Sequence, residues 1–122
     1  MDLLLSARPG RGCTVVEARG ELDMATAPQL RDNLQQLIDS GDRQVVVDMA
    51  GVRFIDSSAL GTLVVMFKSL GEVDGRLSLA GVQPGVRRVL SITSVDRVID
   101  IYDDVHTAET DISTSGGVTR RQ

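Results

Sequence analysis

The sequence predicts a single α/β domain with a small mixed β-sheet, which begins as an antiparallel hairpin and continues as alternating strands and helices packed on it. Three observations predict this class. Short apolar runs at 13–19, 45–49 and 76–80 alternate with segments whose apolar residues recur at helical spacing. Turn residues RPGRG at 8–12 separate the first two apolar segments. The 122 residues suit one core, and no internal repeat indicates a second.

The first half of the chain supplies the hairpin and one helix. Residues 3–5 are expected to pair with a β-branched strand at 13–19 that ends at Gly20. A helix is predicted over 27–40, where Thr26 and Gln29 form a weak capping box and Gly41 provides the stop. Its buried stripe consists of Leu30, Leu34, Leu37 and Ile38.

The second half repeats the strand–helix pattern. The run VVVDM at 45–49 is typical of a central strand covered on both faces, and 50–55 is expected to be a linker. A helix over 58–70, a strand at 76–80, a helix opened by Pro84 and a short strand at 98–102 follow. The domain is therefore predicted to span 2–108, and the small polar residues of 109–122 indicate a disordered tail.

Composition excludes several classes of function. The net charge of −4 disfavours nucleic-acid binding, which depends on clustered Lys and Arg. Cys13 is the only cysteine, so neither an internal disulfide nor a multi-cysteine zinc site is expected. No stretch approaches the roughly 18 apolar residues of a membrane span, and no signal peptide is recognisable. We therefore expect a soluble cytoplasmic protein without a cofactor.

Catalysis is not the favoured interpretation, although two arrangements can be considered. Ser57 would need a base to act as a nucleophile, and the only histidine, His106, is expected in an exposed loop far along the chain. Neither a GxSxG nor a phosphate-binding GxxxxGK motif is present. Asp23, Asp48 and Asp56 could be imagined as a metal cluster, but no ligand spacing joins them, so solvated loops are favoured. The protein is not expected to be an enzyme.

The stretch FIDSSALGTLVVMF at 54–67 leaves two interpretations of its serine open. Ser57 could be an N-cap of the following helix, or it could be a switch that gains charge on phosphorylation. That helix carries more apolar residues than one stripe can bury against one sheet. Its second face either packs against a neighbouring helix or provides a docking patch for another protein.

Three segments of the chain resemble the STAS domain of bacterial anti-sigma factor antagonists. They are GELDMATA at 20–27, VVVDM at 45–49 and VRFIDSSALGTLV at 52–64, and the resemblance continues in order to about Asp104. The DSSxLG core in register with the upstream ELD carries the specificity of the match. Ala59 stands where glycine is common in the family, a small change that should not remove the site.

The resemblance implies a partner-switching protein that is inactivated by phosphorylation. The implied acceptor is Ser57, the serine directly after the aspartate. The implied partner is an anti-sigma factor with serine kinase activity, and a serine phosphatase would reverse the modification. The implied partner-binding residues are Glu21, Leu22, Asp23, Met24, Asp56, Ser57, Ser58, Leu60 and Gly61. The alternative is a scaffold or transporter-associated STAS module whose serine is never modified, because a shared fold does not determine function.

Overall fold

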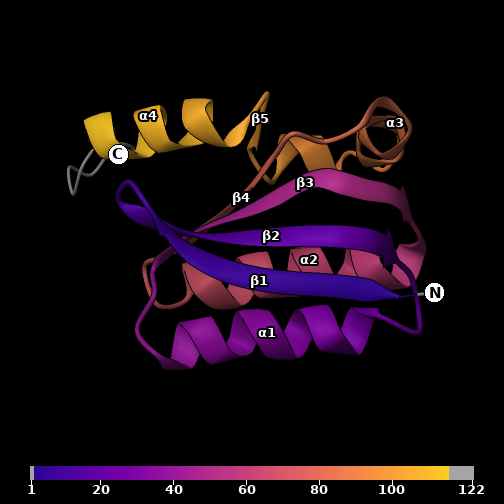
Figure 1. The fold of residues 1–122 in the computed structure, drawn as a ribbon, viewed down its shortest axis with the longest axis horizontal. Coiled ribbons are helices and arrows are strands. Elements are labelled where there is room, and N and C mark those ends of the chain that lie inside the picture. The colour runs from indigo at the N-terminus through magenta and orange to yellow at the C-terminus, as the bar shows by residue number, and fades with distance from the viewer. Residues whose placement is uncertain (1, 116–122) are drawn as a thin grey trace.

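The computed structural model describes residues 2–115, which form one five-stranded sheet with helices on both faces (Figure 1). The strands lie in chain order across the sheet: β1 (Leu3–Gly10), β2 (Cys13–Leu22), β3 (Gln44–Ile55), β4 (Arg76–Ala80) and β5 (Ile101–Tyr102). β1 pairs antiparallel with β2, and the remaining neighbours are parallel. The predicted fold class, a mixed sheet opened by a hairpin, is confirmed.

The helices divide between the two faces of the sheet. Figure 1 shows α1 (Ala27–Asp39) and α2 (Ser57–Gly71) on one face, and α3 (Pro84–Ile92) and α4 (Val105–Ser115) on the other side. A short 3-10 turn, Val95–Arg97, follows α3. No helix within residues 2–115 has the length and apolar character needed to cross a membrane.

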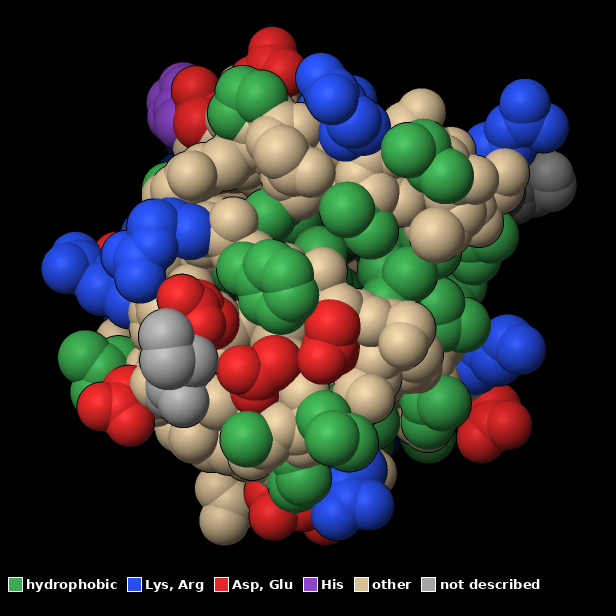
Figure 2. Space-filling view, turned by 90° about the vertical axis from the view of Figure 1, so that its right-hand side faces the viewer, with side chains coloured by type: hydrophobic (Ala, Val, Ile, Leu, Met, Phe, Trp, Pro, Cys, Tyr) green, Lys and Arg blue, Asp and Glu red, His purple; other side chains and the backbone are tan. Residues whose placement is uncertain are grey.

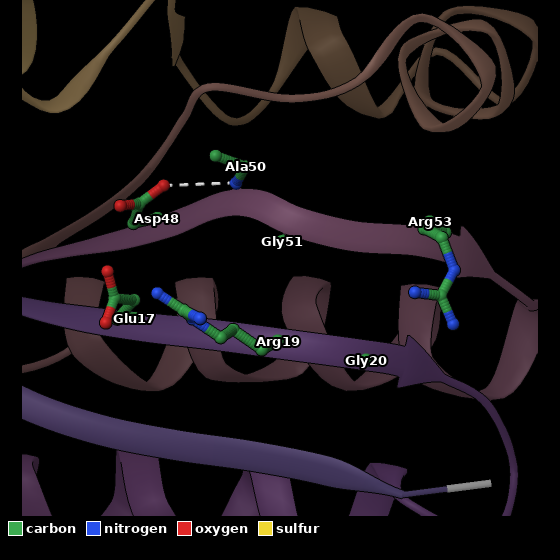
Figure 3. Close-up of a pocket in the computed structure, with 7 residues that line it drawn as sticks. All are labelled: Glu17, Arg19, Gly20, Asp48, Ala50, Gly51 and Arg53. Carbon is green, nitrogen blue, oxygen red and sulfur yellow. Dashed lines mark hydrogen bonds between the residues drawn. The ribbon is translucent and has the colours of Figure 1, made fainter.

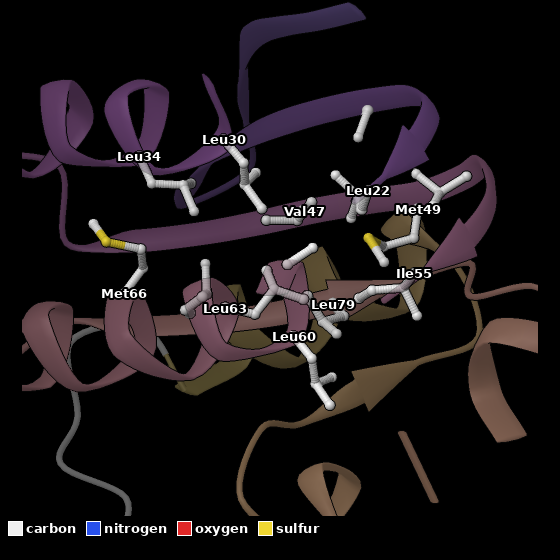
Figure 4. Close-up of a cluster of buried hydrophobic side chains, with 14 of the residues drawn as sticks. Leu22, Leu30, Leu34, Val47, Met49, Ile55, Leu60, Leu63, Met66 and Leu79 are labelled. Atoms are coloured by element: carbon white, nitrogen blue, oxygen red, sulfur yellow. The ribbon is translucent and has the colours of Figure 1, made fainter. Parts of the chain in front are cut away.

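The main core lies between the sheet and the α1–α2 layer (Figure 4). Strand β3 alternates its apolar side chains between the two faces: Val45, Val47 and Met49 enter this core, whereas Val46 joins a smaller cluster under α4. This two-sided burial explains the continuous apolar run of a central strand. The apolar excess of α2 is largely explained by packing against both the sheet and α1, with Leu63 and Met66 buried and Val65 left 55% exposed.

Strand β3 is longer than predicted, because 50–55 continues the strand rather than forming a linker. Gly51 permits the close approach of β2 to this part of β3. A Cβ atom at position 51 would lie 2.8 Å from the Arg19 Cγ and 3.1 Å from the Ala18 carbonyl oxygen. Strand β2 likewise runs past Gly20 to Leu22, with register shifts on either side of Arg19 and Gly20. The ends of the two strands consequently pair, Glu21 opposite Phe54 and Leu22 opposite Ile55.

Three further expectations need correction. The tail prediction is wrong for 109–115, because α4 continues to Ser115 and packs Ala108 and Ile112 over β3 and β4; residues 116–122 lie outside the described part. The strand expected at 98–102 contracts to Ile101–Tyr102, because the 3-10 turn precedes it. Thr26 makes no side-chain cap bond to α1, so the capping box does not form.

Candidate docking site at the start of α2

Helix α2 begins directly where β3 ends, and Asp56 joins the two. The Asp56 N–H donates to the Leu22 carbonyl at 3.0 Å, which continues the β2–β3 pairing into the turn. Its side chain accepts a hydrogen bond from the Ala59 N–H at 3.0 Å, so Asp56 is the N-cap of α2. Ser57 is therefore the first helical residue and not the cap, which corrects the cap interpretation.

The second carboxylate oxygen of Asp56 reaches the loop between β2 and α1. Asp56 Oδ2 accepts a hydrogen bond from the Met24 N–H at 2.9 Å. One carboxylate thus ties the loop of residues 23–26 to the helix that carries Ser57. Two segments separated by about thirty residues of sequence are thereby held as one surface.

The loop is ordered from within by Asp23 and Thr26. Asp23 Oδ1 accepts from the N–H groups of Ala25 and Thr26, both at 3.0 Å. The buried Thr26 hydroxyl donates to the Glu21 carbonyl at 2.8 Å and accepts from the Asp23 N–H at 2.9 Å. This network replaces the predicted capping box, and it holds Met24 at the tip of the loop, 73% exposed.

The predicted partner-binding residues separate into exposed and buried groups. Met24, Ser57, Ser58 and Gly61 are exposed, and Glu21, Asp23 and Asp56 are half-buried. The sequence also places Leu22 and Leu60 on the contact surface, but the structure buries both side chains in the core. Burial of these two apolar side chains in the core is more favourable in free energy than their exposure to water. They therefore pack beneath the surface and do not form part of it.

Ser57 is accessible and uncommitted. It is exposed, and the hydrogen bonds of the described residues include none to its hydroxyl. The neighbouring Ser58 is engaged through its carbonyl, which accepts from the Thr62 hydroxyl at 3.1 Å. A phosphoryl group at Ser57 would meet the positive end of the α2 dipole, which favours an anion, and the Asp56 carboxylate, which opposes it.

The structure separates Ser57 from His106. His106 is exposed, as expected, but it lies in the first turn of α4 rather than in a loop, on the opposite side of the sheet from α2 (Figure 1). The two side chains are therefore not a nucleophile–base pair in this fold.

The three aspartates considered as metal ligands each accept a backbone N–H. Asp48 Oδ1 accepts from the Ala50 N–H at 3.0 Å, while Asp23 and Asp56 hold the loop and the α2 cap. Within residues 2–115, no group of three metal-ligating side chains is positioned to hold an ion.

A separate hollow of about 430 Å³ lies on the uncovered part of the sheet, between α3 and α4 (Figure 3). Its lining is Glu17, Arg19, Gly20, Asp48, Ala50, Gly51 and Arg53. None of the predicted site residues lines it. The Arg53 guanidinium, which lines the hollow, lies 3.6 Å from the Glu21 carboxylate of the Ser57 region.

Sequence reasoning missed one exposed residue at this end of the molecule. Phe54, 49% exposed, lies two residues before Asp56. Phe54 belongs to the stretch VRFI, whose apolar residues are typical of the buried end of a strand. The register shift in the β2–β3 pairing next to Phe54 changes the face on which its side chain lies, and such a shift leaves no signal in the sequence.

Comparison with known proteins agrees with the fold. The STAS domain family matches residues 6–108. The chain is 27% identical over 113 residues to an anti-sigma F factor antagonist of Paenibacillus polymyxa, covering 92% of this chain and 97% of that one. It is 31% identical over 88 residues to an anti-sigma-B factor antagonist of Staphylococcus aureus, covering 72% and 82%. The crystal structure of an anti-sigma factor antagonist from Mycobacterium paratuberculosis superposes with a TM-score of 0.84 at 25% identity, covering 92% of this chain and 95% of that one.

Proposed function

Because the chain belongs to the STAS domain family, we propose that it is an anti-sigma factor antagonist that acts by docking and not by catalysis. In its unphosphorylated form it binds an anti-sigma factor with serine kinase activity, and the sigma factor is released. The observation that carries this proposal is the exposed Ser57 at the start of α2, held beside the Met24 loop by the Asp56 carboxylate.

Phosphorylation of Ser57 switches docking off. A kinase that modifies Ser57 must hold its nucleotide against this hydroxyl, so the transferred phosphoryl group is left beside the remaining diphosphate. Two like-charged groups in a desolvated interface cost several kcal/mol, and each 1.4 kcal/mol is tenfold in affinity. The effect on the fold itself is small, because the helix dipole and Asp56 act on the new charge in opposite directions.

The remaining parts of the proposal follow from this cycle. A serine phosphatase restores the hydroxyl of Ser57 and with it the docking-competent form. The protein acts in the bacterial cytoplasm through protein contacts, without binding nucleic acid or inserting in a membrane; its net charge of −4 supports the first of these exclusions.

A pull-down from the native host tests the proposal. The baits are Ser57→Ala, Ser57→Glu and Thr110→Glu, and bound proteins are identified by mass spectrometry. Thr110→Glu is the matched control, because it adds the same charge at an exposed position of α4. We expect an anti-sigma kinase on the Ser57→Ala and Thr110→Glu baits, and a loss of at least about tenfold on the Ser57→Glu bait.

Equal recovery of the kinase on all three baits would refute the switch. Recovery of membrane transport subunits in place of a kinase would favour the alternative, a scaffold or transporter-associated STAS module. Phosphoserine at position 57 in protein isolated from the host would test the modification directly.

A further inference from the structure

Met24 and Phe54 are large apolar side chains exposed at the end of the molecule where Ser57 lies. Met24 is 73% exposed at the tip of the β2–α1 loop, and Phe54 is 49% exposed near the end of β3. They come from different segments, but the strand pairing of Glu21 with Phe54 and the Asp56–Met24 hydrogen bond bring those segments together.

The exposure of Phe54 is unusual in a chain with so few aromatic residues. The others are Phe67, which packs against the main core, and Tyr102, which packs in the cluster under α4. A single exposed apolar side chain is ordinary, but two at the rim of one candidate site point to contact with another protein. Aromatic side chains and methionine are enriched in the central parts of such contacts.

The surroundings of this pair are acidic. Glu21, Asp23 and Asp56 flank the two segments, and Asp2 is joined to the same strand end through its carbonyl, which accepts from the Glu21 N–H. Figure 2 shows acidic side chains adjoining a prominent hydrophobic side chain near the centre of this face. The Arg53 guanidinium lies nearby, and it is already paired with the Glu21 carboxylate at 3.6 Å.

We propose that Met24 and Phe54 form the apolar anchor of the docking surface, and that the partner offers an apolar pocket bordered by Arg or Lys side chains. In naming a protein partner this inference rests on the proposed function. Burial of two large side chains supplies affinity, while the carboxylates select a basic border and accelerate encounter. The partner's basic groups face Glu21 and Asp23 and not Ser57. A phosphoryl group on Ser57 therefore still meets the negative charge of the partner's bound nucleotide and is repelled by it.

The test uses purified proteins. The titrant is the anti-sigma factor that the Ser57→Ala bait recovers, or, if another protein is recovered, that protein after identification and purification. Isothermal titration calorimetry compares the parent chain with Met24→Ala, Phe54→Ala and Val73→Ala. Val73 is the matched control, because it is an exposed apolar residue just beyond the far end of α2.

We expect Phe54→Ala to weaken binding by about 30-fold, Met24→Ala by about tenfold and Val73→Ala by less than about twofold. Raising NaCl from about 50 to about 300 mM should weaken the parent complex, because oppositely charged rims are screened. Circular dichroism verifies that each variant is folded. If Phe54→Ala fails to fold, Met24→Ala and Phe54→Leu carry the test, with the leucine variant expected to lose less affinity than Met24→Ala.

The outcomes separate this inference from the proposed function. Binding of Met24→Ala and Phe54→Ala within about twofold of the parent, with Ser57→Glu inactive, would overturn the anchor and leave the switch standing. Loss of binding in the anchor variants, with Ser57→Glu fully active, would support the anchor and refute the switch. Recovery of no protein by the Ser57→Ala bait would overturn both, and tighter binding at high salt would overturn the basic border.

Discussion

Removing the carboxylate of Asp56 should both destabilise the fold and loosen the docking surface. In Asp56→Ala two backbone donors lose their acceptor, the Ala59 N–H at 3.0 Å and the Met24 N–H at 2.9 Å. Loss of an N-cap costs about 1 kcal/mol. Loss of the second bond costs about 0.5–1 kcal/mol, because exposed Met24 can bond water instead. We expect the free energy of unfolding to fall by about 2 kcal/mol.

Asp56→Asn is the matched control, because its side chain keeps one acceptor oxygen and is an equally good N-cap. Its amide group would face the Met24 N–H, so the cap is retained and the loop bond is lost. The expected loss of stability is about 1 kcal/mol, and the affinity for the partner should fall although the helix start is intact.

Urea unfolding followed by far-UV circular dichroism measures the stabilities, and hydrogen exchange of the Met24 amide reports the loop bond. Both variants should exchange this amide faster than the parent. A loss below about 0.5 kcal/mol for Asp56→Ala, or unchanged exchange at Met24, would refute the bridging role of the carboxylate.

Three further outcomes are expected. Gly61→Ala should raise stability by about 0.5–1 kcal/mol in urea unfolding, because an added Cβ meets nothing within 4 Å and helix propensity improves. Burial, together with the Glu109 carboxylate, raises the pKa of the Cys13 thiol, so its reaction with a disulfide reagent should be slow near pH 8 and faster in Glu109→Gln. The Thr107 N–H, which donates to Asp104 at 2.7 Å, lowers the pKa of that carboxyl. The stabilisation that the Asp104 carboxylate gives to α4 should therefore be present above the unfolded-state pKa of Asp104. It should disappear as the pH falls through the lower pKa of the folded state. A pH titration of the α4 amide chemical shifts measures this loss.

The elements that could be predicted are those whose burial is regular along the chain. The run VVVDM alternates between two apolar environments and is therefore typical of a central strand. The continuation of β3 through Gly51 could not be predicted in this way, because a glycine in a strand resembles a break. A glycine is needed at position 51 because Arg19 and the Ala18 carbonyl approach the backbone there too closely for a Cβ atom. That contact joins segments that are distant in the sequence.

The second half of helix α4 escapes prediction for a related reason. Beyond Ala108 it is rich in Thr and Ser, which give weak helical periodicity and the composition of a tail. Its order depends on tertiary contacts: Ile112 packs in the small cluster, and the Arg11 guanidinium donates to the Ser113 hydroxyl at 2.7 Å. Contacts across about a hundred residues leave no local signal in the sequence.

The candidate site shows the same division between local and distant information. The DSS motif predicts that Ser57 stands at the start of the helix, but the interpretation of Ser57 as the helix cap is displaced by one residue from the observed cap, Asp56. Asp and Ser are both good N-caps, and the choice depends on which side chain points back at the helix. Here the pairing of the Asp56 N–H with Leu22 orients that residue, so its carboxylate and not the Ser57 hydroxyl becomes the cap.

That displacement by one residue bears on the proposed switch at Ser57. With Asp56 as the cap and Thr26 ordering the loop from inside, the Ala59 N–H and the Asp23 N–H have acceptors that do not involve the Ser57 hydroxyl. The side chains of Met24 and Ser57 are exposed and contribute little to the core. Substitution of either residue should therefore change the free energy of unfolding only slightly. If Ser57 were the cap, its replacement by alanine would cost the fold about 1 kcal/mol. Because the aspartate is the cap, the adjacent Ser57 hydroxyl stays exposed and can take the phosphoryl group of the proposed switch without loss of that cap bond.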